Sequence, residues 1–77
     1  MEYNFENIGN VLKVSLDGRL VAACSEEFKE VVLARMTGRK NVLFDLTKLA
    51  HIDSSGLGAL VHLRQKANSW GGSVKLA

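Results

Sequence analysis

The sequence has no proline, a single cysteine and no long apolar run. Because Cys24 has no partner within the chain, it cannot form an internal disulfide, which is typical of a reducing compartment and predicts a cytoplasmic protein. No apolar run approaches the roughly 18 residues that a helix needs to cross a bilayer. The polar, acidic start at residues 1–4 does not resemble a signal peptide. These absences predict a protein without a membrane-spanning segment, whereas the lack of proline excludes no fold class.

An excess of charge of one sign is also missing. Ten Lys and Arg residues and eight Asp and Glu residues give a formal net charge of +2, with both signs mixed along the chain. This mild excess does not predict direct contact with nucleic acid, which favours clustered basic residues. The hydrophobic fraction of 47% and the charged fraction of 23% favour a folded globular chain over a disordered one. We expect one small domain over residues 1–77, burying about 60–65% of its unfolded surface.

The first 21 residues have the pattern of short strands joined by turns. Apolar and polar residues alternate loosely over residues 3–8 and, with more β-branched residues, over residues 11–16. Glycine and a polar residue at 9–10 predict the turn between these runs, and the Asp-Gly pair at 17–18 predicts a second turn. Residues 20–21 are enough for a short extended piece. The start of the chain is therefore expected to be an antiparallel meander.

From residue 25 the apolar residues recur at steps of three and four, which predicts an amphipathic helix. The residues of this apolar stripe are Phe28, Val31, Val32 and Met36. We expect Cys24 or Ser25 to cap the helix and Gly38 to end it. Acidic residues expected in the first turn and basic residues near the end would complement the helix dipole: Glu26, Glu27, Arg35, Arg39 and Lys40.

A nearly continuous apolar run at residues 41–46 predicts a central strand covered on both faces. A second helix is expected over residues 55–69, ended by glycines at 71–72 and followed by a strand over 73–76. The residues expected on its buried face are Leu57, Leu60, Val61, Leu63, Ala67 and Trp70. Two strands joined by a helix form a parallel pair. The sequence therefore predicts an α/β fold, a mixed β-sheet with an N-terminal antiparallel meander and helices packed on it.

The step from the central strand into the second helix carries two adjacent hydroxyls. Asp53, Ser54 and Ser55 are residues that prefer helix caps, because their side-chain oxygens accept hydrogen bonds from first-turn amides. Gly56 and Gly58 leave the first turn bare, so that another backbone or a partner could approach closely. Two interpretations of the serines stay open. They are helix caps, or one of them accepts a phosphate at the positive end of the helix.

Catalysis is not predicted by the residues around these serines. The Gly-x-Ser-x-Gly pattern of serine hydrolases is absent, because Ile52 and Asp53 stand where its first glycine would be needed. His51 precedes the helix and His62 lies two turns into it, which is more typical of ordinary surface residues than of a catalytic base. We therefore predict that the chain is not an enzyme.

Cofactor and metal sites are not predicted either. The spacing Gly56-x-Gly58 lacks the third glycine and the lysine of nucleotide-binding loops. Asp45 and Asp53 lie on opposite sides of an expected loop, and two such carboxylates do not make a cation site. Cys24 is interpreted as a small residue at the start of a helix rather than as a reactive thiol.

Two segments of the chain, 43–46 (LFDL) and 51–60 (HIDSSGLGAL), resemble the anti-sigma factor antagonist family, the STAS domains of bacteria. The signature of that family is a hydrophobic strand ending in Asp-Leu, a short loop, and Asp-Ser-Ser-Gly-Leu-Gly opening a helix. The match is complete at residues 53–58, and the resemblance covers residues 3–77. The family domain continues with a further helix, strand and helix. The resemblance therefore implies a STAS-like fold that lacks this C-terminal part.

The resemblance also implies a function in transcription regulation by partner switching. By similarity to the family, Ser54 is the phosphoacceptor for a partner that is both the anti-sigma factor and a serine-protein kinase. The unphosphorylated chain would bind this partner and the phosphorylated chain would release it. The residues implied to form the docking surface are Asp53, Ser54, Ser55, Gly56 and Leu57. A phosphatase would be a second partner, and a homodimer formed by domain exchange is a further expectation. The alternative is an unphosphorylated STAS module for interaction or ligand sensing in a transport or stress-signalling complex.

Overall fold

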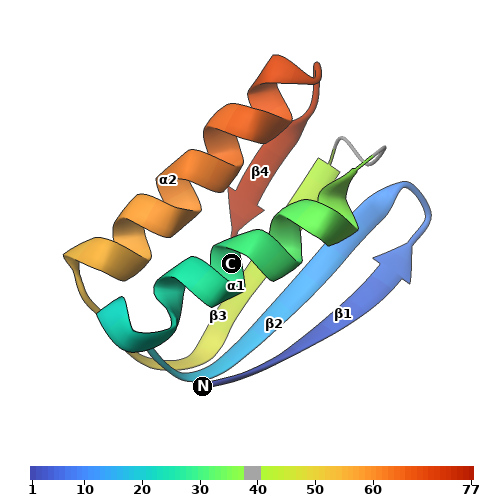
Figure 1. Cartoon of the computed structure of the whole chain (residues 1–77). Coiled ribbons are helices and arrows are strands. Elements are labelled where there is room, and N and C mark those ends of the chain that lie inside the picture. The colour runs from blue at the N-terminus through green and yellow to red at the C-terminus, as the bar shows by residue number, and fades with distance from the viewer. Residues whose placement is uncertain (38–40) are drawn as a thin grey trace.

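The computed structural model describes residues 1–37 and 41–77 of the chain. Strands and helices follow one another in the order that the sequence predicts (Figure 1). The elements are β1 (Glu2–Ile8), β2 (Val11–Leu20), α1 (Ala22–Met36), β3 (Asn41–Ile52), α2 (Ser54–Ser69) and β4 (Ser73–Leu76). Gly38, Arg39 and Lys40, which the sequence places at the end of the first helix, lie outside the described residues.

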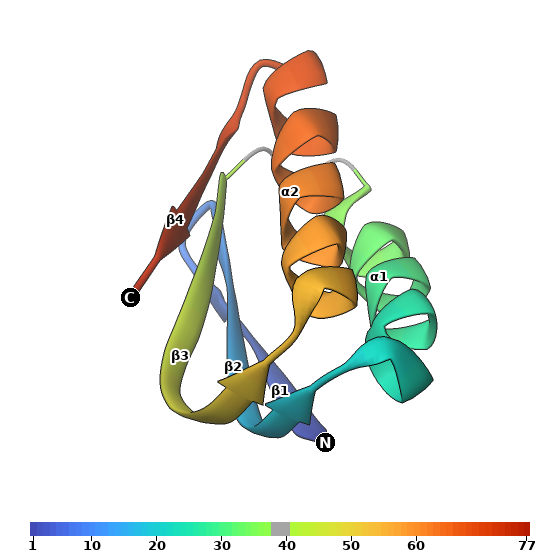
Figure 2. The ribbon, with the colours of Figure 1, turned by 90° about the vertical axis from the view of Figure 1, so that its left-hand side faces the viewer.

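The four strands form one mixed sheet in the order β1-β2-β3-β4. β1 and β2 are antiparallel, whereas β2, β3 and β4 are parallel neighbours joined through the two helices. Figure 2 shows both helices on the same side of the sheet. The prediction that the central strand is covered on both faces is therefore wrong for the described part of the chain. The exposed face can remain in water because polar residues occupy it, for example the cross-strand pair Glu6 and Lys13.

The hydrophobic core lies between the sheet and the two helices. Alternate side chains of β2 point towards the helices, because successive residues of a strand face opposite sides. Three aromatic rings pack together in this core, with Tyr3 edge-on to Phe28 at 5.4 Å and Phe28 6.2 Å from Phe44. The buried residues of the core are Leu12, Val14, Leu16, Leu20, Phe28, Val32, Met36, Val42, Phe44, Leu60, Leu63 and Ala67.

The two central strands are longer than the sequence predicts. β2 runs through the expected turn at residues 17–18, where Gly18 has a φ of 109° and the pairing with β3 shifts register on either side. The glycine therefore accommodates an irregularity within the strand rather than a turn. β3 extends to Ile52 instead of Leu46, because the longer β2 gives it hydrogen-bonding partners such as Arg19, which lies opposite His51.

The first helix begins earlier than predicted. α1 starts at Ala22 after Val21, so neither Cys24 nor Ser25 is its cap, and the expected placement of Glu26 and Glu27 in the first turn is wrong. Val21 provides no side-chain oxygen, and the cap of α1 comes from elsewhere in the chain. At the other end of the helix, the predicted position of Arg35 near the end is confirmed.

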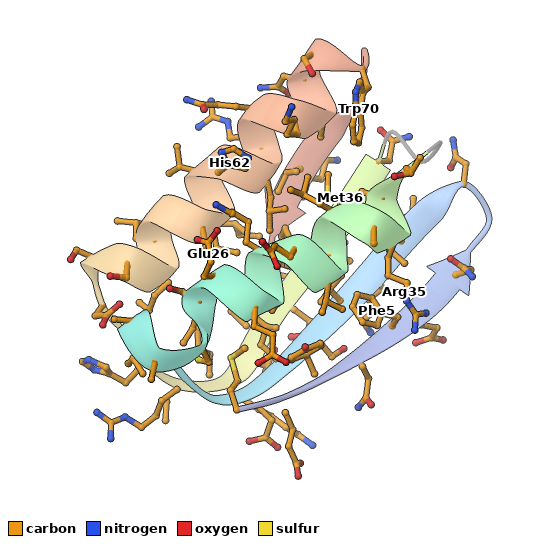
Figure 3. All side chains as sticks on the ribbon, in the orientation of Figure 1. Phe5, Glu26, Arg35, Met36, His62 and Trp70 are labelled. Carbon is orange, nitrogen blue, oxygen red and sulfur yellow. The ribbon has the colours of Figure 1, made fainter. Side chains whose placement is uncertain are left out.

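Arg35 lies in the last turn of α1, where a positive charge complements the helix dipole. Its guanidinium carbon stands 4.6 Å from the centre of the Phe5 ring (Figure 3). This cation–π contact ties the end of α1 to the edge strand β1.

The buried face of α2 is only partly the predicted one. Leu60, Leu63 and Ala67 are buried as expected, together with Gly56 and Ala59. The three other residues predicted to be buried are exposed, at 55% for Leu57, 43% for Val61 and 37% for Trp70. Each residue turns a helix by about 100°, so Leu57 and Val61 lie outside the arc of α2 that faces the core. Trp70 lies past the end of the helix, as its C-cap.

Candidate functional site

Asp53 sets the geometry of the step from β3 into α2. It is the N-cap of α2, with an extended backbone (φ −103°, ψ −176°), and its Oδ1 accepts a hydrogen bond from the Gly56 N–H at 2.9 Å. The Leu57 N–H donates to the Asp53 carbonyl oxygen, also at 2.9 Å, and closes the first helical turn. The cap is therefore the aspartate, and the interpretation of the two serines as caps is wrong.

Ser54 and Ser55 occupy the first two positions of α2, and both are exposed. Within the described part of the chain, neither hydroxyl takes part in a hydrogen bond with another residue. Because Asp53 already satisfies the Gly56 amide, the serine hydroxyls are not needed to hold the helix end. Their side chains are therefore available to an external group.

The second oxygen of Asp53 reaches the other helix. Oδ2 accepts a hydrogen bond from the Ala22 N–H at 3.0 Å, and the Asp53 N–H donates to the Leu20 carbonyl oxygen at 3.2 Å. One carboxylate thus bonds to first-turn amides of both helices. The hydrogen bond from Gly56, followed by that from Ala22, holds the pKa of Asp53 below its ordinary value of 3.8, against the opposing effect of desolvation.

Gly56 lets α2 lie directly on the end of β2. A Cβ at this position would collide with the Leu20 carbonyl oxygen and stand 2.8 Å from Leu20 Cγ and 2.9 Å from Ile52 Cγ1. The expectation of a close approach at this glycine is confirmed, and the group that approaches is the backbone of Leu20 in the same chain. Gly58 differs, because nothing lies within 4 Å of its added Cβ.

An apolar groove continues from the start of α2 along its exposed side to β4. Leu57 stands at the end near Ser54, three positions further along the helix. Among the groove residues, Leu57, Val61 and Leu76 expose large apolar side chains. The groove is lined by Leu57, Leu60, Val61, Arg64, Val74 and Leu76.

The other candidates from the sequence are held by local contacts. Cys24 is half-buried, and its Sγ donates to the carbonyl oxygens of Arg19 and Val21 at 3.4 and 3.5 Å. Asp45 accepts hydrogen bonds from the Thr47 hydroxyl and N–H, which lower its pKa.

Within residues 1–37 and 41–77, no group of three metal-ligating side chains comes together. Of the helices described there, neither has the length and apolar character needed to cross a bilayer.

The fold and this site define a class of small α/β domain in which a mixed sheet presents the N-terminus of a helix beside the start of another. The chain matches the STAS domain family over residues 2–77 and belongs to that family. A search of curated proteins found no match.

Solved structures of anti-sigma factor antagonists share the fold. The unphosphorylated form of the antagonist SpoIIAA superposes with a TM-score of 0.81 at 19% identity, covering 97% of this chain and 71% of that one. The phosphorylated form of the same Bacillus protein gives 0.76 at 18% identity, covering 95% and 68%. A putative antagonist from Thermotoga maritima gives 0.90 at 22% identity and covers 96% and 65%.

A transporter contains the same fold. The murine anion transporter Slc26a9 superposes with a TM-score of 0.76 at 24% identity, covering 92% of this chain and 12% of the transporter. The chain therefore spans about two thirds of the length of the antagonists and a small part of the transporter. At these identities, the likeness establishes the fold.

Proposed function

We propose that the chain is an anti-sigma factor antagonist, a regulatory binding domain without catalytic activity of its own. Its partner is an anti-sigma factor that is also a serine-protein kinase, and both act in the cytoplasm. The observation that carries this proposal is the exposed Ser54 at the first position of α2, beside the carboxylate of Asp53. The shared fold with SpoIIAA, which has been solved with and without its phosphate, supports it.

The proposed modification is phosphoryl transfer from ATP bound to the kinase. The Ser54 Oγ attacks the γ-phosphorus, an O–P bond forms, the bond to the bridging oxygen of the leaving ADP breaks, and a base of the kinase takes the hydroxyl proton. The added group carries about −1.5 to −2 charges at neutral pH. Free amides and the dipole at the start of α2 stabilise such an anion, so the fold tolerates it.

The switch acts on the surface around Ser54. Asp53, Ser55 and Leu57 surround this residue in the docking surface, and Gly56 lies beneath them against β2. An unphosphorylated surface allows the partner to cover Leu57 and the serines. A phosphate beside Asp53 adds like-charge repulsion and a desolvation penalty to the same contact, so that the partner is released.

Two substitutions at Ser54 test the proposal. We expect Ser54→Ala to bind the partner within about threefold of the unmodified chain, and Ser54→Asp to bind at least about tenfold more weakly, equivalent to about 1.4 kcal/mol. Isothermal titration calorimetry with the purified partner measures both affinities. Equal affinities of the two variants would overturn the proposal.

Phosphorylation itself is measured by intact mass and peptide mapping after incubation with the kinase and ATP. A single phosphate on Ser54 is expected, and Ser54→Ala should abolish it. Ser55→Ala is the matched control, because it removes the neighbouring exposed hydroxyl and should leave phosphorylation intact. A phosphate that maps to Ser55 would contradict the assignment.

Two further partners belong to the proposal. A phosphatase restores the binding form by removing the phosphate from Ser54. A second copy of the chain is the other partner, in a homodimer formed by domain exchange. The position of the four-residue β4 at the edge of the sheet supports this exchange, because few hydrogen bonds hold it in place.

A second candidate function keeps the fold and omits the switch. The likeness to the murine anion transporter favours a STAS module for interaction or ligand sensing within a transport or stress-signalling complex. The experiments above separate the two candidates, because this module would take no phosphate and would bind equally well with alanine or aspartate at position 54.

A further inference from the structure

The start of α2 is joined to the junction between β2 and α1 by three contacts. Two are hydrogen bonds of Asp53, whose N–H donates to Leu20 and whose Oδ2 accepts from the Ala22 N–H, and the third is the close packing of Gly56 on Leu20. Asp53 and Ala22 are 31 positions apart in the sequence. The first turns of the two helices are therefore held together by tertiary contacts.

The bond to Ala22 has a specific role, because α1 lacks a cap of its own. Its N-cap residue is Val21, which makes no side-chain hydrogen bond to the helix. The first amides of a helix have no intrahelical acceptor, and an anionic acceptor is favoured there. Asp53 therefore supplies from α2 the acceptor that α1 requires, while Oδ1 keeps its bond to the Gly56 N–H.

We propose that Asp53 is a positioning residue through which the phosphorylation state of Ser54 reaches the first turn of α1. This inference rests on the proposed phosphorylation of Ser54. It adds a second part to the phosphorylation-sensitive surface, formed by the exposed Ala22 and Ala23.

The physical reason is competition at one helix end. A phosphate on Ser54 brings a second anion to the same helix start, directly beside the Asp53 carboxylate, and like charges on adjacent residues repel. The Oδ1 bond to Gly56 lies within the same turn of α2, whereas the Oδ2 bond to Ala22 is exposed and joins separate elements. The Ala22 bond is therefore the one that lengthens, and the first turn of α1 loses its acceptor.

The amide of Ala22 reports this change directly. We expect phosphoserine installed at position 54 during synthesis to speed hydrogen exchange at Ala22 by about fivefold, which corresponds to about 1 kcal/mol, the usual net value of one hydrogen bond. Two-dimensional NMR measures the exchange rates of single amides. Asp53→Asn should speed exchange at Ala22 without phosphate, because an amide side chain that still accepts from Gly56 has only a donor to turn towards Ala22.

Two controls separate this route from a general effect of charge. Phosphoserine at Ser69, at the other end of α2, should leave the Ala22 amide unchanged. Asp45→Asn removes a carboxylate that bonds to Thr47, and it should have no effect at Ala22 either.

A proline at position 22 cuts the proposed route while preserving the helix start. Ala22→Pro removes the N–H that Asp53 accepts, and the first position of a helix tolerates proline. Val21 already has the extended backbone that the residue before a proline adopts, with a ψ of 174°. In the unsubstituted chain, loosening of this first turn should also speed exchange at the neighbouring Ala23 amide. In Ala22→Pro, phosphoserine at position 54 should no longer do so, whereas the control Ala22→Ser, which retains the N–H, should behave as the unsubstituted chain.

The outcomes are decisive without a partner or a kinase. An Ala22 exchange rate that phosphoserine at position 54 leaves unchanged overturns the inference, as does an effect on Ala23 that persists in Ala22→Pro. If Asp53→Asn fails to fold, the phosphoserine comparison still decides. If the kinase does not phosphorylate the chain, the proposed function is wrong. The coupling from position 54 to Ala22 is still tested by the synthetic protein, which carries phosphoserine without a kinase.

Discussion

At the scale of single residues, two glycines of the same helix turn have opposite surroundings. Gly56 faces the Leu20 backbone and Ile52, and Gly58 faces open space. A side chain at position 56 must push α2 away from β2, because the nearest atom is a backbone oxygen that cannot rotate aside. Gly56 is therefore required for packing, whereas Gly58 is not, although the two lie only two positions apart.

We predict that Gly56→Ala lowers the free energy of unfolding by about 1–3 kcal/mol, the usual cost of overpacking a tight contact. Gly58→Ala is the matched control and should raise it by up to about 1 kcal/mol, because alanine in a helix loses less backbone freedom on folding than glycine. Urea unfolding followed by circular dichroism measures both. Equal effects of the two substitutions would show that a Cβ at position 56 fits against Leu20 without strain.

At the scale of elements, α2 has one buried face and one exposed face that both carry large apolar residues. Leu63 is fully buried against the core, while Leu57 begins the exposed groove that ends at Leu76 on β4. The pattern of apolar residues along the helix does not show which face is buried, since both faces carry apolar residues at helical spacing. The contact with α1 and the sheet selects the buried one.

We predict that Leu63→Ala lowers the free energy of unfolding by about 2–5 kcal/mol, as is usual for a truncated core leucine. Leu57→Ala should change it by less than about 0.5 kcal/mol, because the side chain is already exposed to water. If the proposed docking surface is right, the same Leu57→Ala variant should bind the anti-sigma partner more weakly. A large loss of stability in Leu57→Ala would contradict the exposed position of this residue.

At the scale of the whole molecule, one residue, Asp53, connects both helices to the sheet, and the ionisation of its carboxyl group is linked to folding. The pKa of Asp53 is lowered in the folded chain, so the unfolded chain binds more protons in acid. This contribution to stability is complete above the ordinary pKa of 3.8 and is lost as the pH falls through the lower folded value. Asp45 adds a contribution of the same sign through its bonds to Thr47.

We therefore predict that the stability of the unsubstituted chain falls as the pH drops below about 5, and that Asp53→Asn shows a shallower fall. Urea unfolding at a series of pH values measures the slope for each protein. Asp45→Asn should reduce the slope independently, because its hydrogen bonds do not involve the helices. An unchanged slope in Asp53→Asn would mean that the carboxylate has the same pKa in the folded and unfolded chain.

The sequence by itself determined the order of elements, the mixed sheet and the placement of the Asp-Ser-Ser-Gly step at the start of a helix. These features depend on apolar periodicity and on residues that prefer caps, which act over a few neighbouring positions. The expected antiparallel start and parallel continuation of the sheet were correct for the same reason. Local preference did not decide which of the three cap-forming residues at positions 53–55 would be used.

Only the tertiary structure decided the remaining features. The strand ends follow from pairing between β2 and β3, the exposed position of Leu57 follows from the face that α2 packs on, and the cap of α1 comes from Asp53. Each depends on a partner far along the chain, such as Ala22 and Asp53 at a separation of 31 residues. A sequence pattern reports neighbours within one element, whereas these contacts form only when the helices and the sheet are packed together.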